Sequence, residues 1–294
     1  MMSNLCVGCG RNCRVDRKAG RLGYCKMPDD LVVAKACLHF GEEPCITGTG
    51  GSGTVFFSGC SLGCVFCQNH DISVNKTGKK ITEERLSEIF YELEMKGAEN
   101  INLVTPSHYV DKIIEALNIY HPNIPIVYNS SGYESVNSLE KLSKYIDVYL
   151  LDFKYFSNER AKRYSNAENY PDIAKKSILS AYKNVNCECV FDEKGRMTKG
   201  IIIRHLILPQ GTNDAINIID WCKKNVPNSA FSLMSQFLPL GESDIYKEIN
   251  RKITKREYEK VASALDNTDF CVVYTQELNS ATDELIPDFN LEGV

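Results

Sequence analysis

Three cysteines, Cys60, Cys64 and Cys67, form a C-x3-C-x2-C triplet directly after a short apolar stretch, Thr54–Ser58, that we expect to be a β-strand. Three thiolates can hold three corners of a [4Fe-4S] cube and leave one iron without a protein ligand, whereas a structural cluster normally has four cysteines. An iron with a free coordination position can bind a molecule from outside the protein. The triplet therefore predicts a reactive iron–sulfur site.

Other interpretations of the triplet have weaker support. A structural zinc site usually has four ligands, commonly from two pairs of cysteines, and the stretch after Cys67 offers only His70 as a nearby fourth ligand. Unliganded core cysteines are a further alternative. Closely spaced thiols in an intracellular chain, however, usually bind metal.

The sequence around the triplet resembles the signature of the radical S-adenosylmethionine (radical SAM) superfamily. Within it, Phe57–Cys60 (Phe-Ser-Gly-Cys) and Cys67–Asn69 (Cys-Gln-Asn) most resemble uncharacterised relatives of pyruvate formate-lyase activating enzyme. The resemblance implies that the free iron chelates the amino and carboxylate groups of SAM, and that the reduced cluster cleaves SAM to a 5'-deoxyadenosyl radical. It also implies an oxidoreductase that receives electrons from a reductant such as flavodoxin or ferredoxin. The cofactors would do the chemistry while the protein positions them.

Short apolar strands alternate with helical segments along the rest of the chain. Repeated β-α units imply a parallel sheet with helices on its outside. We therefore expect an α/β fold with a partial (β/α)6-type TIM-like barrel over residues 51–294, and Thr82 as the N-cap of its first helix. The expected strands are Thr54–Ser58, Ile101–Val104, Ile126–Tyr128, Val148–Phe153, Ile201–Leu208, Phe231–Gln236 and Cys271–Tyr274, and the expected helices are Thr82–Lys96, Tyr109–Tyr120, Ser135–Lys144, Pro171–Lys183, Asn213–Lys224 and Thr254–Leu265.

Polar residues gather at the carboxyl ends of the expected strands, where barrel enzymes carry their chemistry. The resemblance implies that Asn129, Asp152 and Lys154 contact SAM, because they match strand-end segments of the activating enzymes. It also implies that Arg204 faces SAM and that Phe66, just before the last cysteine, borders the adenine. A zwitterionic ligand needs partners of both signs, so an aspartate and a lysine suit it. A simple Asx turn is the alternative role for the Asn129 segment.

Arg204 and His205 are neighbours in the apolar strand Ile201–Leu208, and strand alternation puts their side chains on opposite faces. At most one of them points into the barrel. A lone strand histidine is more often a satisfied core residue than a catalyst, so the prediction favours Arg204. Gln236 at the next strand end could equally be a packing amide. We predict no acid–base pair, since the radical itself would perform the key step.

The segment Gly48–Gly53 matches the G-x-G-x-x-G pattern of dinucleotide-binding loops, but its context is wrong. That fingerprint follows a strand and precedes a helix, whereas these glycines precede the strand that leads to Cys60. We expect instead that they let the chain enter the barrel tightly and pass close to the cluster or SAM.

A second group of cysteines, Cys6, Cys9, Cys13 and Cys25, lies in a loop-rich stretch near the N-terminus. Residues 1–50 show almost no apolar periodicity, so we expect a cysteine-rich lobe that a bound metal organises. The four thiolates would close a structural zinc site or hold an auxiliary [4Fe-4S] cluster, and the spacing does not decide between the two. The other cysteines are Cys37 and Cys45, which are candidate substitute ligands, and Cys187, Cys189, Cys222 and Cys271, which we expect to be small core hydrophobes.

Length and charge narrow the class of protein. The 294 residues are enough for one catalytic domain with a small appendage. The 34 lysines and arginines against 38 aspartates and glutamates give a net charge of −4, so no basic field favours nucleic acid as a partner. The sequence shows neither an apolar signal segment after Met1 nor a run of about 18 apolar residues that would span a membrane. We therefore expect a cytoplasmic protein.

These features predict a radical SAM enzyme whose radical abstracts hydrogen from a substrate, with a glycyl-radical protein as one candidate target. In the related activating enzymes, extra clusters usually lie in an insert after the triplet, whereas the extra cysteines here precede Cys60. Two alternatives stay open. One is the same chemistry on a peptide, a nucleotide or a small molecule, and the other is a non-catalytic iron–sulfur protein that transfers electrons or serves as a scaffold.

Overall fold

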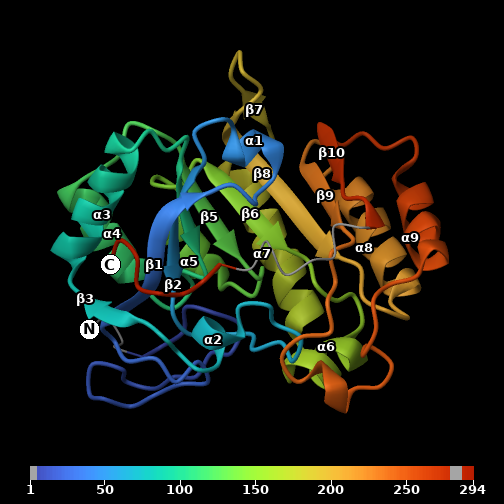
Figure 1. Ribbon diagram of the computed structural model, residues 1–294, viewed down its shortest axis with the longest axis horizontal. Helices are drawn as coiled ribbons and strands as arrows, with labels where there is room; N and C mark the ends of the chain where they lie inside the picture. Colours follow the sequence, from blue (N-terminus) through green and yellow to red (C-terminus); the bar gives the residue numbers. More distant parts are fainter. Residues whose placement is uncertain (1–4, 279–286) are drawn as a thin grey trace.

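A computed structural model describes residues 5–278 and 287–294 and shows one curved sheet with helices packed against it (Figure 1). Its parallel strands are β2 (Ser52–Phe57), β4 (Ile101–Val104), β5 (Ile126–Ser130), β6 (Val148–Asp152), β8 (Met197–Leu206), β9 (Ala230–Met234) and β10 (Val272–Thr275). They follow the spatial order β10-β9-β8-β6-β5-β4-β2. The molecule is thus a mixed α/β fold with a largely parallel sheet, consistent with a partial TIM-like barrel.

Helices connect the successive parallel strands. The expected N-cap is confirmed, because the side chain of Thr82 accepts a hydrogen bond of 3.2 Å from the Arg85 backbone N–H. No helix among the described residues is both long and apolar enough to cross a membrane. The helices are α2 (His70–Ser73), α3 (Glu83–Met95), α4 (Val110–Ile119), α5 (Val136–Leu142), α6 (Asn158–Ser165), α7 (Tyr170–Asn184), α8 (Thr212–Asn225) and α9 (Lys255–Ala262), with short 3-10 turns at Ser243–Ile245 and Ser263–Leu265.

Helix α6 lies between the expected strand Val148–Phe153 and the expected helix Pro171–Lys183, in a stretch for which the sequence predicts neither a strand nor a helix. Four of its eight residues are charged, and its buried residues are Ala161, Tyr164 and Ser165, which have helical spacing but include only one large apolar side chain. Ser157 caps it by accepting a hydrogen bond from the Arg160 N–H. The Ser157 cap and the packing of this narrow buried face stabilise the helix.

The sheet also contains a segment that the sequence placed elsewhere. The expected boundary at residue 50 puts Leu31–His39 in the cysteine-rich lobe, whereas the structure pairs this segment, as β1, antiparallel with β2. Strand β3 (Lys79–Ile81) pairs with β1, and a two-residue strand, β7 (Val190–Phe191), pairs with β8. The boundary is therefore wrong for these residues, because β1 buries Leu31 and Val33 against the barrel. Among the described residues, β10 and β3 are the two edges of the sheet, so the barrel is open.

Alternate residues of the parallel strands face the inside of the curved sheet. Val127, Leu150 and Ile202 belong to one buried apolar cluster there, together with Ile46 of the short helix α1 (Pro44–Thr47). Because the side-chain period of a strand is two, the next inward positions toward the carboxyl ends of these strands are polar. An apolar plug thus fills the amino-terminal part of the barrel, and polar groups line its carboxyl-terminal mouth.

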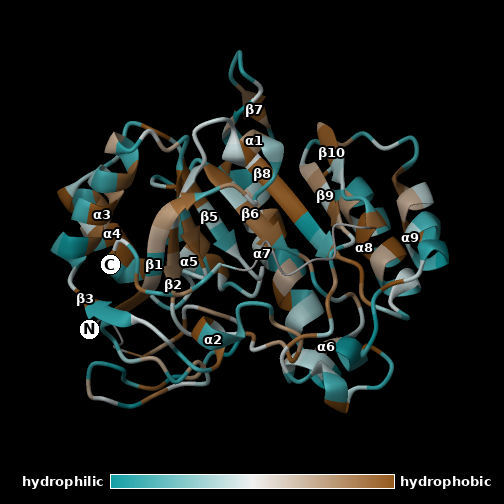
Figure 2. Cartoon of the chain, in the orientation of Figure 1, coloured by the Kyte–Doolittle hydropathy of each residue, from teal (hydrophilic) through white to brown (hydrophobic). Residues whose placement is uncertain are grey.

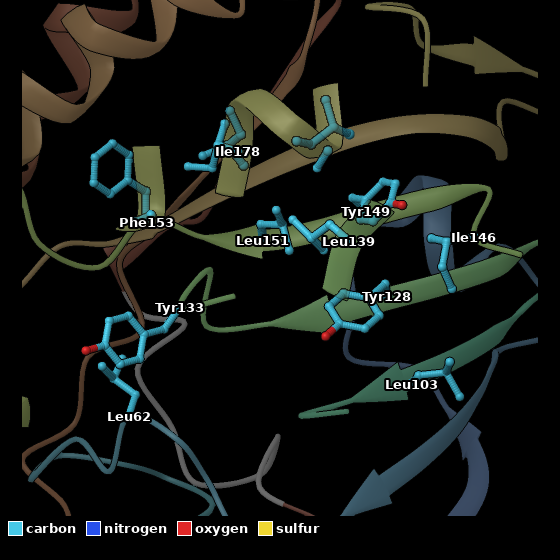
Figure 3. Close-up of a cluster of buried hydrophobic side chains, with 14 of the residues drawn as sticks. Leu62, Leu103, Tyr128, Tyr133, Leu139, Ile146, Tyr149, Leu151, Phe153 and Ile178 are labelled. Atoms are coloured by element: carbon cyan, nitrogen blue, oxygen red, sulfur yellow. The ribbon is translucent and has the colours of Figure 1, made fainter. Parts of the chain in front are cut away.

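The opposite face of the sheet packs against the helices in the larger core. Tyr128 and Leu151 of the sheet lie there with Leu139 of α5 and Ile178 of α7 (Figure 3). Figure 2 shows the same arrangement as apolar strands flanked by helices that carry hydrophilic residues. Both faces of the central strands are buried, which explains why their sequences are almost continuously apolar.

The glycine-rich segment lies at the amino-terminal end of β2, whereas the cysteine loop follows the carboxyl end of the same strand. The expectation that it passes close to the cluster or SAM is therefore wrong. A Cβ at Gly53 would lie 2.8 Å from the Cβ of Ala98, and Gly50 packs against the Gly97 carbonyl. These glycines allow close contact with the loop that precedes β4.

The cysteines that we expected in the core differ in their burial. Cys222 is fully buried in α8, whereas Cys271 is exposed and Cys187 and Cys189 are half-buried. Cys45 belongs to the apolar plug and not to the N-terminal cysteine group. The prediction that all four of the late cysteines are core hydrophobes is therefore wrong for Cys271, which precedes β10 at the rim of the sheet.

Candidate functional site

The cysteine triplet lies on the loop between β2 and α2, at the carboxyl end of the barrel. Cys60, Cys64 and Cys67 all line one cavity of about 190 Å³. Burial raises the pKa of the Cys60 thiol to about 12, and the neighbouring Cys67 and Cys64 thiols act in the same direction. Thiolates at these positions therefore need a positively charged centre to stabilise them, as iron does in a cluster. The donor set fits an iron–sulfur cluster.

Hydrogen bonds hold the loop and contact its sulfurs. Arg11, from the N-terminal stretch, donates from Nε to the Ser61 carbonyl at 2.8 Å and from Nη2 to the Ser165 carbonyl at 2.7 Å. The Ser165 hydroxyl lies 3.1 Å from the Cys64 sulfur, and the Ser73 hydroxyl lies 3.3 Å from the Cys67 sulfur. Hydrogen bonds to cluster sulfurs are among the features that set the reduction potential of iron–sulfur sites.

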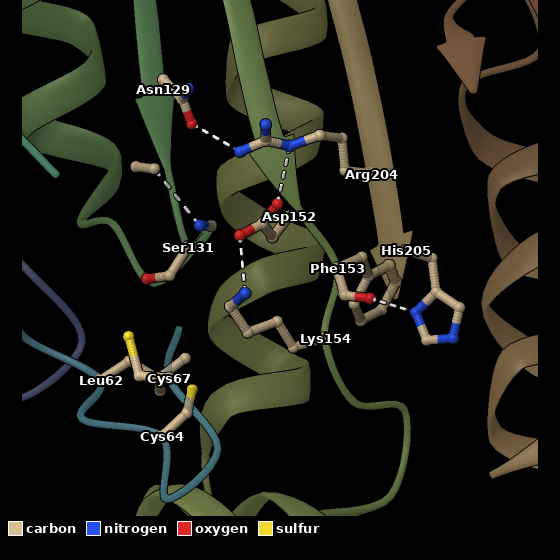
Figure 4. A network of polar contacts seen from close by, with 12 residues as sticks. Leu62, Cys64, Cys67, Asn129, Ser131, Asp152, Phe153, Lys154, Arg204 and His205 are labelled. Atoms are coloured by element: carbon tan, nitrogen blue, oxygen red, sulfur yellow. Dashed lines mark hydrogen bonds and ion pairs between the residues drawn. The ribbon is translucent and has the colours of Figure 1, made fainter. Parts of the chain in front are cut away.

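Four of the residues that the resemblance singles out form one polar network beside the triplet (Figure 4). Arg204 donates from Nε to Asp152 Oδ1 at 2.9 Å and from Nη2 to Asn129 Oδ1 at 2.6 Å. The Lys154 ammonium lies 2.7 Å from Asp152 Oδ2. The structure thus brings Asn129, Asp152, Lys154 and Arg204 together, and all four line the cavity that the cysteines share.

The register of the sheet explains this convergence. Asp152 pairs with Arg204 across β6 and β8, and Asn129 stands on the neighbouring strand β5. Each of these residues follows an inward-facing apolar residue by two positions, so all three point into the barrel. Lys154 comes two residues after the end of β6 and returns its side chain toward Asp152.

Opposite charges govern protonation in the network. Burial alone would raise the pKa of Asp152, but the Lys154 and Arg204 charges outweigh it and hold that pKa below its ordinary value. Burial alone would lower the pKa of Lys154, but the Asp152 carboxylate raises it above its ordinary value. Asp152 and Lys154 are therefore both charged at neutral pH, which provides one partner of each sign for a zwitterionic ligand.

Glu42 belongs to the same network, and it is not among the site residues that the sequence predicts. Its Oε2 accepts a hydrogen bond of 2.9 Å from Arg204 Nη1, and its Oε1 accepts one of 3.0 Å from Asn129 Nδ2. Glu42 precedes α1, in the segment that the sequence assigns to the N-terminal lobe. The local sequence feature that could have indicated a role for Glu42 is the pair of adjacent glutamates, Glu42 and Glu43, directly before Pro44 and with no lysine or arginine beside it.

Phe66 and His205, two other candidates from the sequence, are both buried. Phe66 is buried at the rim of the cysteine-lined cavity, and its ring lies edge-on to those of Tyr155 and Phe237. His205 points away from Arg204 (Figure 4), and its Nδ1 lies 2.7 Å from the Phe153 carbonyl oxygen. Burial lowers the pKa of His205, so it is a neutral core residue, as the alternation predicted.

The N-terminal cysteines form a second group beside the first. Burial raises the pKa of the Cys9 thiol to about 12, and the charges of Cys6 and Cys25 add to this effect. Burial also raises the pKa of the Cys25 thiol, and the Cys6 and Cys13 thiols act in the same direction, so all four thiols interact electrostatically. Cys25 lines a cavity of about 370 Å³ together with Cys60. Among the described residues, no three His, Cys, Asp or Glu side chains are arranged to hold a single metal ion.

An α/β barrel whose mouth combines a cysteine triplet with a charged pocket is the architecture of an iron–sulfur enzyme with a small-molecule cofactor. The sequence profile of the radical SAM superfamily matches residues 54–193, which contain the cysteine loop. The chain is also 32% identical over 278 residues to an uncharacterized protein of Methanocaldococcus jannaschii, and the alignment covers 92% of this chain and 76% of that protein. The chain belongs to the radical SAM superfamily, and it is a radical SAM enzyme. Membership implies a [4Fe-4S] cluster and SAM as cofactors.

Two solved structures of Streptococcus suis SuiB, one bound to S-adenosylmethionine and one bound to the precursor peptide SuiA, have a similar fold. Each has a TM-score of 0.52, with identities of 16% and 17%, and the alignments cover 76% and 77% of this chain. This chain spans about half the length of the SuiB chains, 50% and 49%. At this level of identity the similarity shows a shared fold alone.

Proposed function

We propose that Cys60, Cys64 and Cys67 hold the [4Fe-4S] cluster and that SAM binds between it and the carboxyl ends of β5, β6 and β8. The observation that supports this assignment is the single cavity that the triplet shares with Asp152 and Lys154. When bound and reduced, the cluster supplies the electron that cleaves SAM to methionine and a 5'-deoxyadenosyl radical, which then takes a hydrogen atom from the substrate.

The residues of the cavity would bind and orient SAM. Lys154 would face the SAM carboxylate, because its charge interacts with Cys64 and Cys67 and it lines the cavity that the triplet shares. Asp152 and Asn129 offer oxygen acceptors for the ammonium group, and Arg204 holds both in place. Phe66 would border the adenine and exclude water from that side of the cavity.

The electron donor is proposed to be a small redox protein such as flavodoxin or ferredoxin. The N-terminal cysteines Cys6, Cys9, Cys13 and Cys25 are proposed to hold a second centre, zinc or an auxiliary [4Fe-4S] cluster. Their proximity to the loop of Cys60 supports the view that this centre stabilises the face on which the triplet lies.

The identity of the substrate that donates the hydrogen atom determines which reaction the enzyme catalyses. A glycyl-radical protein is the target that the family resemblance suggests, and a peptide, a nucleotide or a small molecule would use the same chemistry. A large protein that copurifies with the enzyme and acquires a glycyl radical, visible by electron paramagnetic resonance, would support the first. Hydrogen abstraction from a small molecule in the absence of any partner protein would support the second.

The decisive experiment measures 5'-deoxyadenosine. The protein is reconstituted anaerobically with iron and sulfide, and SAM and dithionite are added. We expect product from the wild type, none from a Cys60/Cys64/Cys67→Ala variant, and product at the wild-type rate from Cys271→Ala, which removes an exposed cysteine outside the site. A wild-type protein with a complete cluster that forms no product would support an electron-transfer or scaffold role instead.

A further inference from the structure

A second cavity adjoins the proposed SAM site inside the barrel. Its volume is about 420 Å³, and it shares Asn129, Arg204, Met234 and Gln236 with the cavity that the triplet lines. Small-molecule sites typically have volumes of about 300–1,000 Å³. A molecule bound in this second cavity would lie beside a SAM molecule bound in the first.

Carboxylates outnumber cations around this cavity. Among the described residues that line it, Glu42, Glu43 and Glu277 carry carboxylates, and Arg204 is the one arginine or lysine. The guanidinium of Arg204 is already engaged, because Nη1 donates to Glu42 and Nε donates to Asp152. Glu277 is exposed to water. Glu43 is therefore the buried carboxylate to which Arg204 makes no hydrogen bond.

Two hydrogen-bond acceptors on the cavity wall have no donor. Glu43 is only 8% exposed, and its Oε2 has no hydrogen-bond partner. Asn69 Oδ1 is likewise buried without a partner, and Asn69 lines both cavities. Burial raises the pKa of Glu43, and the Arg204 charge, which lowers it, does not outweigh that effect. His39 on the same wall cannot supply the charge, because burial lowers its pKa.

We propose that this cavity holds the hydrogen-donor substrate and that the substrate carries a protonated amine or a guanidinium group, with Glu43 as its carboxylate partner. A cation with several N–H groups can donate to unpartnered acceptors of this kind and also balances the negative charge, whereas a neutral hydroxyl can donate but does not balance the charge. Glu43 lines the second cavity but not the one that the triplet shares, whereas Asn129 and Arg204 line both cavities. A cation bound at Glu43 would therefore leave the rest of the substrate to extend toward SAM. The inference rests on the proposed function.

The test measures binding and not turnover. Anaerobic, cluster-loaded protein is saturated with SAM and kept without a reductant, so that the SAM site is filled and no cleavage occurs. Isothermal titration calorimetry then compares L-arginine with L-citrulline and L-lysine with L-norleucine, pairs that differ in charge more than in size. A second arm compares Ala-Lys-Ala with Ala-norleucine-Ala, which separates a free amine from a peptide side chain. We expect at least one cationic probe to bind on the order of tenfold tighter than its neutral match.

Variants at Glu43 identify the partner. Glu43→Gln should abolish the preference for the cation, and Glu43→Asp, which keeps the charge, should retain part of it and so exclude general misfolding. Glu188→Gln changes an exposed glutamate outside the cavity and should leave the preference intact. Equal binding of charged and neutral probes by the wild type, or a preference that survives in Glu43→Gln, overturns the proposal.

The substrate proposal and the proposed function fail in different ways. If the wild type forms 5'-deoxyadenosine with dithionite but shows no charge preference, the substrate class is rejected and the radical SAM function stands. If cluster-loaded protein forms no 5'-deoxyadenosine, the function itself is rejected, together with the substrate assignment that depends on it.

Discussion

Gly132 lies so close to the backbone of Asp152 that a Cβ at position 132 would come within 3.0 Å of the Asp152 carbonyl oxygen. Gly132 also has a φ of +71°, in the left-handed region that favours glycine. It follows β5, whereas Asp152 ends β6. The absence of a side chain at Gly132 therefore sets how closely the two strand ends approach, and with it the spacing between Asn129 and Asp152.

Gly132→Ala should weaken SAM binding, because the added methyl group pushes the ends of β5 and β6 apart. We expect a loss of affinity on the order of tenfold or more, measured by equilibrium dialysis with the cluster-loaded protein. Gly195→Ala is the matched control, since Gly195 has a φ of +75° but nothing within 4 Å of its Cβ position. Equal SAM affinity in the two variants would contradict the proposed role of Gly132.

Asp152 should stabilise the fold in a pH-dependent manner. Its pKa in the folded protein is below the ordinary value of about 3.9, so its contribution is complete above that value and is lost as pH falls through the lower folded pKa. Asp152→Asn leaves the Lys154 and Arg204 charges without this partner and should destabilise the protein by about 3–5 kcal/mol at pH 7.

The measurement for Asp152 is the unfolding midpoint between pH 7 and pH 2. The difference between the wild type and Asp152→Asn should shrink as the pH falls below about 4. Asp244→Asn, at an exposed aspartate, should show no such convergence. A difference that stays constant over the whole range would show that the charge of Asp152 is not what stabilises the site.

Lys154→Met should reduce the affinity for SAM while the cluster still forms. The substitution keeps much of the side-chain volume but removes a charged hydrogen-bond donor, which is typically worth about 1.5–3 kcal/mol, or about 10- to 100-fold in Kd. Affinity is measured by dialysis, and the cluster is followed by its visible absorbance and iron content. Unchanged SAM affinity with a normal cluster would refute the assignment of Lys154.

Cys9→Ser should remove the N-terminal metal and spare the cluster of the triplet. A closed four-thiolate site loses most of its affinity with one ligand gone, whereas the loop of Cys60 keeps all of its own ligands. Metal analysis of the anaerobically purified protein should show about four iron atoms per chain retained in the variant. Identical metal content in the wild type and the variant would exclude a metal centre at this group.

Thr254→Ala tests the helix α9, which lies away from the site. Thr254 and Glu257 form a reciprocal capping box, in which the Thr254 hydroxyl accepts a hydrogen bond from the Glu257 N–H at 3.2 Å. Loss of this cap should cost about 1 kcal/mol of unfolding free energy, measured by urea denaturation. SAM cleavage should stay at the wild-type rate, and a large loss of activity would show that α9 is coupled to the barrel mouth.

Much of the site was predictable because it depends on local spacing and on strand periodicity. The C-x3-C-x2-C triplet is contiguous, so its chemistry is visible in the sequence alone. Asn129 and Asp152 lie at the ends of strongly apolar strands and Arg204 lies in the carboxyl-terminal half of another, and parallel strands bring their carboxyl ends to one side of a sheet. The alternation of side chains along a strand likewise predicts opposite faces for Arg204 and His205, and their separate hydrogen-bond partners confirm it.

Other parts of the site were decided only by tertiary structure. Glu42 and Glu43 reach the barrel interior because β1 returns antiparallel beside β2, a long-range pairing that the local pattern of residues 1–50 did not indicate. Helix α6 buries only Ala161, Tyr164 and Ser165, and its packing partners, such as Cys64 beside Ser165, lie far away in the sequence. Local residue patterns thus determined the chemistry that the cysteine loop can perform. The packing of β1 and α1 against the barrel decided which carboxylates line the cavity beside it, because such contacts depend on chain segments that no short sequence window contains.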